Sequence, residues 1–125
     1  MNKIIHTENA PAAIGPYSQA VQAGNLLFVS GQIPVDPATG AFAGEDISVQ
    51  ARQSLTNVKA ILEAAGYTLA DVGKTTVLLV DMANFAAVNA VYSEFFSENC
   101  PARACFAAKA LPKGALVEIE AIAVK

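Results

Sequence analysis

The sequence predicts a single α+β domain in which strands pack on two helices. Its length of 125 residues suits one hydrophobic core. Two segments show the three- and four-residue apolar spacing of amphipathic helices, and short runs rich in β-branched and aromatic residues lie before, between and after them. Because no linker, repeat or low-complexity run divides the chain, residues 1–125 are expected to form one domain.

Two amphipathic helices are predicted from this spacing. The first covers residues 47–65, with Asp46 available as its N-cap and Gly66 as its C-terminal stop. The second covers residues 85–96, and Asn84 can cap it. Each helix should bury one apolar face against a sheet.

Strands are predicted at residues 26–33, 75–80, 102–110 and 115–124. The first of them follows a Gly-Asn turn signal, and a short Leu-Pro-Lys-Gly segment joins the last two. The predicted order along the chain is strands, helix, strand, helix and two final strands.

The composition indicates a protein that hides apolar surface. Hydrophobic residues make up 54% and charged residues 15% of the chain, against about 45–50% and about 25% in typical soluble domains. No apolar run is long enough for a membrane span and the N-terminus lacks a signal-peptide pattern, so we expect a cytoplasmic oligomer with no membrane partner. The net charge of −3 and the scattered Lys and Arg residues favour no nucleic-acid partner.

Both faces of the predicted strands are apolar, although the two helices can cover only one of them. A neighbouring subunit is expected to cover the second face. Single polar groups on that face are costly unless they have partners, so they are either candidates for a site or satisfied across the interface between subunits. They are Ser30, Gln32, Glu118, Glu120 and, if residues 102–106 are extended, Arg103 and Cys105.

The two cysteines do not predict a redox or metal site. Four residues separate Cys100 from Cys105, and His6 is the only histidine, so one chain supplies neither a Cys-x-x-Cys pair nor four zinc ligands. Cys105 is expected to be a buried, inert thiol and Cys100 to lie in a loop, and His6 is assigned no role. Arg103, between the cysteines in Cys-Pro-Ala-Arg-Ala-Cys, is therefore either a loop residue without a role or a group aimed at an anionic ligand.

Several motifs, taken in order, resemble the RidA/YjgF family. They are IGPYSQAV, FVSGQIPVDPATG, QARQSLTNVKAILEAAG, KTTVLLVDMANFAAVNAVYSEFF, PARACF and VEIEAIAV, which together span nearly the whole chain. The resemblance implies a chorismate-mutase-like α+β subunit with a mixed β-sheet packed on two helices. It also implies a homotrimer around a barrel-like core, with three clefts at the subunit interfaces.

The resemblance further implies an enamine/imine deaminase that needs no cofactor. Such enzymes hydrolyse 2-aminoacrylate and related 2-imino acids, formed by pyridoxal-phosphate-dependent dehydration of serine or threonine, to 2-ketoacids and ammonia. Arg103 matches the essential arginine, whose planar guanidinium can hold a substrate carboxylate through two hydrogen bonds. Glu118 matches a glutamate that positions or polarises the attacking water.

The same resemblance assigns substrate-binding positions to five other residues. Tyr17 caps the cleft, Ser30 and Gly31 line it with a hydroxyl and a backbone N–H, Asn89 belongs to the neighbouring wall, and Cys105 contributes its backbone. Glu120 is expected to form a structural ion pair. The short segment before Arg103, Ser-Glu-Asn-Cys-Pro-Ala, leaves substrate size open, because many relatives are longer there.

Two other functions remain open at this point. The clefts could act as sensors that bind a 2-ketoacid without turnover, because an arginine that holds an imino acid also holds the product. An endoribonuclease is less favoured, since phosphodiester cleavage needs a His or Lys acid/base pair near a basic groove.

Overall fold

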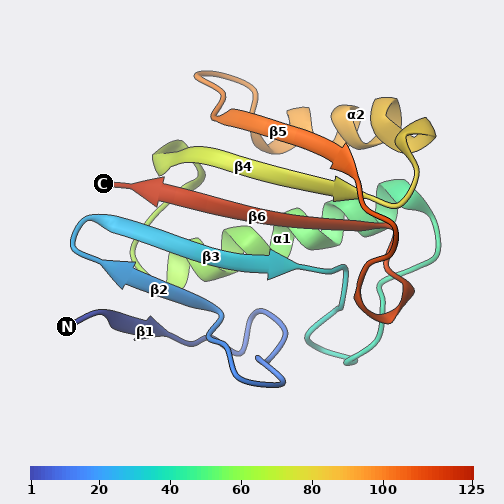
Figure 1. The fold of residues 1–125 in the computed structure, drawn as a ribbon. Coiled ribbons are helices and arrows are strands. Elements are labelled where there is room, and N and C mark those ends of the chain that lie inside the picture. The colour runs from blue at the N-terminus through green and yellow to red at the C-terminus, as the bar shows by residue number, and fades with distance from the viewer.

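A computed structural model describes all residues from 1 to 125 and shows one mixed sheet with both α-helices on the same face (Figure 1). The strand order is β1-β2-β3-β6-β4-β5, and only β4 and β5 are parallel neighbours. The elements are β1 (Lys3–Ile5), β2 (Ala20–Ala23), β3 (Leu26–Gln32), α1 (Ile47–Ala64), β4 (Val72–Leu79), α2 (Phe85–Phe95), β5 (Ala102–Ala107) and β6 (Val117–Val124). The predicted mixed sheet packed on two helices is thus confirmed, and neither helix is long and apolar enough to cross a membrane.

Helix α1 begins and ends where the sequence predicts. The Asp46 carboxylate accepts hydrogen bonds from the backbone N–H groups of Ser48 and Val49, at 3.0 and 3.2 Å. At the other end Gly66 has a φ of +80°, a conformation that glycine adopts at no steric cost. Local chemistry therefore sets both ends of this helix.

The prediction that Asn84 caps α2 is wrong. Its side chain makes no capping hydrogen bond, because a 3₁₀ turn, Met82–Asn84, leads directly into the helix and gives Asn84 helical φ and ψ angles. Asp81 serves this end instead, since its carboxylate accepts from the backbone N–H of Ala83 at 2.9 Å.

The strand limits depend on the neighbours that each strand pairs with. Strand β4 begins three residues earlier than predicted, because its pairing with β6 already starts at Val72. Strand β2 was not predicted, since Ala-Val-Gln-Ala carries little strand signal, and it forms by pairing between β1 and β3. Strands β5 and β6 are shorter than predicted because residues 108–116 form a loop with a 3₁₀ turn.

The core lies between the sheet and the helices. Helix α1 contributes Leu55, Val58 and Leu62, which are completely buried with strand residues such as Val77 and Ile119. Each fully buried aliphatic side chain stabilises the fold by about 1.5–3 kcal/mol. This packing fixes which face of every strand turns toward the helices.

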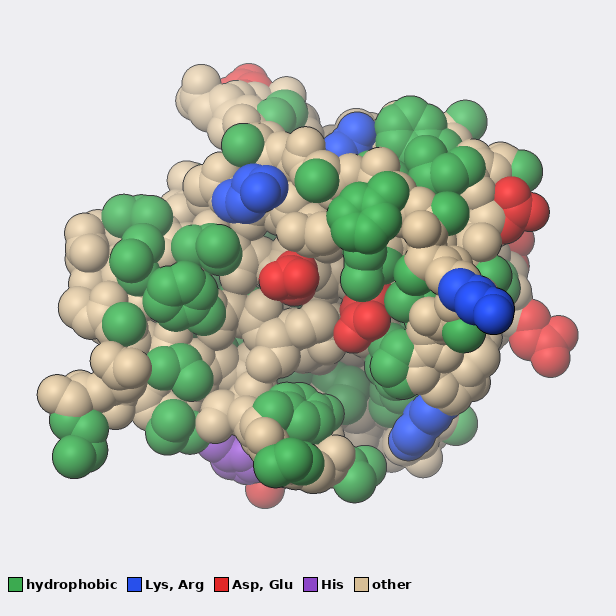
Figure 2. Space-filling view, in the orientation of Figure 1, with side chains coloured by type: hydrophobic (Ala, Val, Ile, Leu, Met, Phe, Trp, Pro, Cys, Tyr) green, Lys and Arg blue, Asp and Glu red, His purple; other side chains and the backbone are tan.

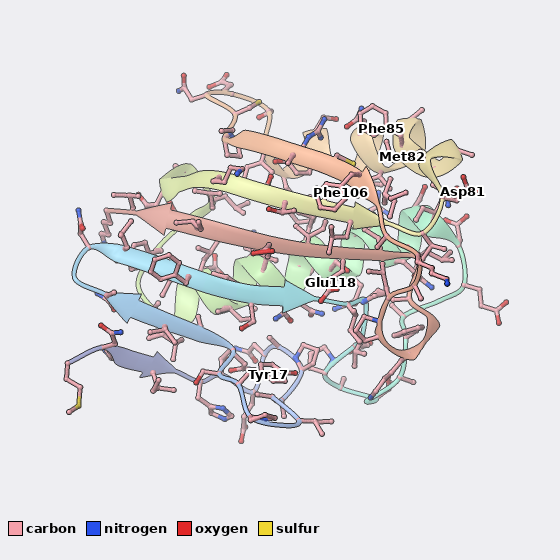
Figure 3. All side chains as sticks on the ribbon, in the orientation of Figure 1. Tyr17, Asp81, Met82, Phe85, Phe106 and Glu118 are labelled. Carbon is pink, nitrogen blue, oxygen red and sulfur yellow. The ribbon has the colours of Figure 1, made fainter.

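The other sheet face carries no helix and is rich in exposed apolar side chains, which Figure 2 shows around acidic groups. Phe106 is 51% exposed and Phe28 44% exposed, and Val124 at the end of β6 is also exposed. Phe106 and Glu118 align across this face, because each pairs with Leu78 of β4 (Figure 3). The predicted apolar character of both faces is confirmed, and the subunit that would cover the open face remains a prediction.

Candidate active site

Four of the predicted site residues meet in one cleft beside the sheet. The cleft measures about 920 Å³ and is bounded by the loop between β1 and β2, the end of β3 and the start of β6. Tyr17 comes from the loop and Glu118 from β6 (Figure 3), while Ser30 and Gly31 come from β3. These side chains form the acidic half of the candidate site.

A β-bulge in β3 presents Ser30 and Gly31 to this cleft. Val29 pairs with Ala121 and Gln32 with Ile119, so three steps along β3 match only two steps along β6. Strict alternation would place residues 29 and 32 on opposite faces, but both pair with core residues. The prediction that Gln32 shares the open face with Glu118 is therefore wrong; its side chain is buried, and its Nε2 donates to the carbonyl of Ser30 at 3.1 Å.

Glu118 is half-buried, and no hydrogen bond or ion pair within the chain holds its carboxylate. Burial raises the pKa of Glu118, and the nearby charge of Glu120 raises it further. The expected ion pair of Glu120 is not formed within this chain, whose only salt bridge joins Arg52 and Glu94. Glu118 thus has the environment of a group that keeps its proton to a higher pH than an ordinary glutamate.

The loop that carries Tyr17 is fastened by a buried amide. Gln19 is 2% exposed, its Oε1 accepts from the N–H of Thr7 at 2.7 Å, and its Nε2 donates to the carbonyls of Thr7, Ala10 and Pro11. The phenol oxygen of Tyr17 accepts a long hydrogen bond, 3.4 Å, from the N–H of Ile14. Gln19 had no assigned role, although it belongs to the Gly-Pro-Tyr-Ser-Gln motif.

His6 and Lys113 also line the cleft, together with Glu8. Sequence reasoning assigned none of them to the site. Nothing in their local sequence marks them, because loops bring them to the cleft from opposite ends of the chain.

The second half of the candidate site surrounds Arg103 on β5. Its Nη1 donates to Oδ1 of Asn89 on α2 at 2.8 Å. The guanidinium carbon lies 4.8 Å from the ring centre of Tyr92 and 5.6 Å from that of Phe85, within the range of cation–π attraction. Arg103, Asn89 and the two rings therefore form a basic half-site against α2.

The side chains that pack against Arg103 from the core side hold the Arg103 half-site in place. The hydroxyls of Tyr92 and Thr75 share a buried hydrogen bond of 2.7 Å, and burial raises the pKa of Tyr92. Burial also raises the pKa of the Cys105 thiol, which Arg103 lowers to a smaller extent. Cys105 is half-buried rather than buried as predicted, and Cys100 lies in a loop as predicted.

The two half-sites lie on opposite faces of one chain. Arg103 pairs with Thr75, which is 1% exposed on the helix side, and Thr75 pairs with Ala121, three residues from Glu118. Three residues along a strand and two strand spacings put the Cα atoms of Arg103 and Glu118 about 14 Å apart. The prediction that Arg103 and Cys105 share a face with Glu118 is therefore wrong for a single chain, because both turn toward α2.

The fold and the two half-sites define a class of protein: an α+β subunit with an open apolar sheet face, an acidic cleft at one end and an arginine at the opposite sheet edge. The family model described as "Endoribonuclease L-PSP" matches residues 7–125. The chain belongs to this family, the RidA/YjgF family.

Relatives in this family match the chain over almost its whole length. It is 59% identical over 128 residues to the 2-iminobutanoate/2-iminopropanoate deaminase of Salmonella typhimurium, covering 100% of this chain and 99% of the relative. The crystal structure of the YjgF gene product from E. coli matches with a TM-score of 0.95 and 56% identity, covering 98% of each chain. E. coli TdcF with bound serine matches with the same TM-score and 51% identity, again over 98% of each chain.

Proposed function

We propose that this chain is an enamine/imine deaminase, which hydrolyses 2-aminoacrylate and related 2-imino acids to 2-ketoacids and ammonia. The names of its close relatives support this activity. We further propose that it works as a homotrimer in which each active site lies between two subunits. The observation that carries this proposal is the separation of Arg103 from Glu118 within one chain.

A single chain cannot bring both residues to one small substrate. In a 2-imino acid the carboxylate carbon is bonded directly to the imine carbon, whereas Arg103 and Glu118 lie on opposite sheet faces about 14 Å apart. Arg103 of one subunit must therefore meet Glu118 of another. The uncovered apolar sheet face provides a surface for such an assembly.

Arg103 is proposed to bind the substrate carboxylate. A guanidinium has five N–H donors, and within the chain only an Nη1 donor is engaged, by Asn89. The remaining donors can hold a carboxylate through two parallel hydrogen bonds. The serine bound to the relative TdcF is a small molecule that carries a carboxylate of this kind.

Glu118 is proposed to move the proton during hydrolysis. Water attacks the carbon of the protonated imine, a C–O bond forms, and Glu118 accepts the proton that the water loses. Glu118 then returns this proton to the nitrogen and takes up the proton of the new hydroxyl as the C–N bond breaks and the C=O bond of the ketoacid forms. The departing ammonia takes this last proton, so Glu118 is again a carboxylate. The raised pKa of Glu118 suits both transfers, because it brings the carboxyl closer to the working pH.

Ser30 is proposed to orient the substrate nitrogen. Its hydroxyl donates to the carbonyl of Ser18 at 2.5 Å, which leaves the hydroxyl oxygen free to accept a hydrogen bond from an N–H group. Tyr17 covers the outer side of the cleft, Gly31 offers a backbone N–H to the ligand, Asn89 holds Arg103, and Cys105 contributes only its backbone. Water is the only other reactant, so the reaction as written uses no cofactor.

A coupled assay distinguishes this proposal from a ketoacid sensor. A serine or threonine dehydratase generates the imino acid, and ketoacid release is followed with and without this protein. Arg103→Ala should lose both 2-ketobutyrate binding and turnover, a loss of about 2–5 kcal/mol for a charge-assisted contact removed from water. Glu118→Gln should keep ketoacid affinity and lose rate, because its role is in the transition state. An assembled wild-type protein that binds ketoacid without accelerating its release would be a sensor.

Endoribonuclease activity is the second candidate, because His6 and Lys113 line the same cleft and the family description carries that name. Glu8 and Glu118 also line the cleft, so it does not provide a basic groove for a phosphate backbone. We expect the purified protein to leave single-stranded RNA intact under conditions in which it releases ketoacid.

A further inference from the structure

The backbone conformation of Gly31 does not require glycine. Five other glycines of the chain have positive φ angles, which other residues rarely adopt, but Gly31 is not among them. It is also exposed at the cleft, so core packing does not account for its small size.

The position of the Glu118 side chain accounts for the absence of a side chain at Gly31. A Cβ atom added to Gly31 would lie 2.9 Å from Cδ and 3.1 Å from Cγ of Glu118, and it would overlap the carboxylate oxygen Oε2. Atoms of this kind do not approach so closely, so the Glu118 carboxylate occupies the room that a side chain at position 31 would take.

Two features make the proximity of Gly31 and Glu118 important: the bulge in β3 and the lack of hydrogen-bond or ion-pair partners for the Glu118 carboxylate. The bulge brings Gly31 beside β6, where Glu118 projects from the open face. No hydrogen bond or ion pair within the chain fixes the carboxylate of Glu118, and its atoms lie in the space that a Cβ at position 31 would take.

We propose that Gly31 is a positioning residue for the reaction: its missing side chain provides the seat in which the Glu118 carboxylate is held toward the cleft. This inference rests on the proposed function of Glu118 and adds a second role to the N–H that Gly31 offers to a ligand. Any side chain at position 31 displaces the carboxylate from its seat, while Arg103 of the neighbouring subunit keeps its own position.

Gly31→Ala tests this role, and Gly73→Ala is the matched control. Gly73 lies in β4 without a positive φ, and its only close neighbour is the carbonyl oxygen of Ile122 at 4.0 Å from an added Cβ. Gly31→Ala should lower kcat by about 100-fold, the effect of a misplacement of about 1 Å in a catalytic group. Its affinity for 2-ketobutyrate should stay within about twofold of the wild type, because Arg103 carries that binding. Gly73→Ala should keep kcat and affinity.

A double-mutant cycle between positions 31 and 118 tests whether glycine is needed at position 31 because of the Glu118 side chain or for another reason. Gly31→Ala should shift the urea midpoint of unfolding downward in the wild-type background and leave it unchanged in the Glu118→Ala background, where the overlapping side chain is absent. Since Gly31→Ala should fold normally in the Glu118→Ala background, poor folding of the single variant does not prevent the measurement.

Three results would overturn the inference. The first is an undiminished kcat in Gly31→Ala. The second is an equal loss of ketoacid affinity in the wild-type and Glu118→Ala backgrounds, which would mean that glycine makes room for the ligand. The third is an equal loss of assembly in both backgrounds by light scattering, which would mean that glycine makes room for another subunit. The unfolding cycle does not depend on turnover. A wild-type protein without deaminase activity would therefore refute the proposed function, while the cycle would still decide whether Gly31 seats Glu118.

Discussion

Two inactive variants, Arg103→Ala and Glu118→Ala, should restore activity to each other when their subunits mix. Each variant removes a group that the proposed reaction needs, so each homo-oligomer should be inactive in the coupled dehydratase assay. Because the two residues lie on opposite faces of one chain, the proposed site takes Arg103 from one subunit and Glu118 from the next. A mixed oligomer can therefore contain sites in which both groups are native.

The size of the recovery follows from this arrangement. A site is complete only where the subunit that supplies arginine is the Glu118→Ala chain and the subunit that supplies glutamate is the Arg103→Ala chain. With equal amounts and random mixing, each condition holds with a probability of one half. About one quarter of the wild-type activity is therefore expected in any closed ring of identical subunits.

The two chains can be unfolded together in urea, refolded by dilution and assayed at equal total concentration. Each variant refolded alone serves as the control, and light scattering checks that all three samples have the same oligomeric mass. If the mixture forms but its activity stays at the level of the separate variants, both groups must act within one chain. The interfacial site would then be refuted, and so would the trimer in which it is placed.

Two further outcomes are expected. The first compares Glu118→Gln with the native glutamate, both in the Arg103→Ala background, where the guanidinium proposed to face Glu118 is absent. Because the pKa of Glu118 is raised in the folded protein, its stabilising contribution is complete below the pKa of about 4.3 in the unfolded chain and is lost as the pH rises through the folded-state pKa. Glu118→Gln should therefore stabilise the protein at pH 7 and lose this advantage near pH 4. Urea unfolding at several pH values measures this, and a difference between the two proteins that does not change with pH would contradict it. Cys105→Ser should keep most of the deaminase activity, since burial raises the pKa of the thiol and only the backbone is assigned a role; loss of turnover with intact ketoacid binding would instead give the thiol a chemical function.

Sequence patterns were most reliable where neighbouring residues decide the structure. Helix α1 was predicted closely, because the apolar spacing, the Asp46 cap and the Gly66 stop all act within a few residues. The cap of α2 was mistaken, because the 3₁₀ turn that begins at Met82 satisfies the helix start before Asn84 is reached. Strand β2 was missed for the opposite reason, since pairing with β1 and β3 supplies what its own residues lack.

Face assignments in the strands failed where alternation was assumed to continue. The extra residue in β3 pairs Gln32 with the core residue Ile119 and buries it, and leaves Ser30 and Gly31 at the cleft. Parallel pairing with β4 turns Arg103 toward α2, which the sequence of β5 alone does not determine. The candidate residues were thus named from sequence and from family resemblance, but their placement in two separate half-sites was not.

The sequence by itself determined the class of fold, the ends of the first helix and the apolar character of both sheet faces, while the roles of Arg103 and Glu118 came from the family resemblance. These features depend on periodicity and local chemistry, which the order of residues contains directly. Only the tertiary structure decided that Arg103 and Glu118 are separated and that the Glu118 carboxylate lies against the bare backbone of Gly31. Both facts depend on the register between strands distant in sequence, and a shift of one residue in that register exchanges the two faces of a strand.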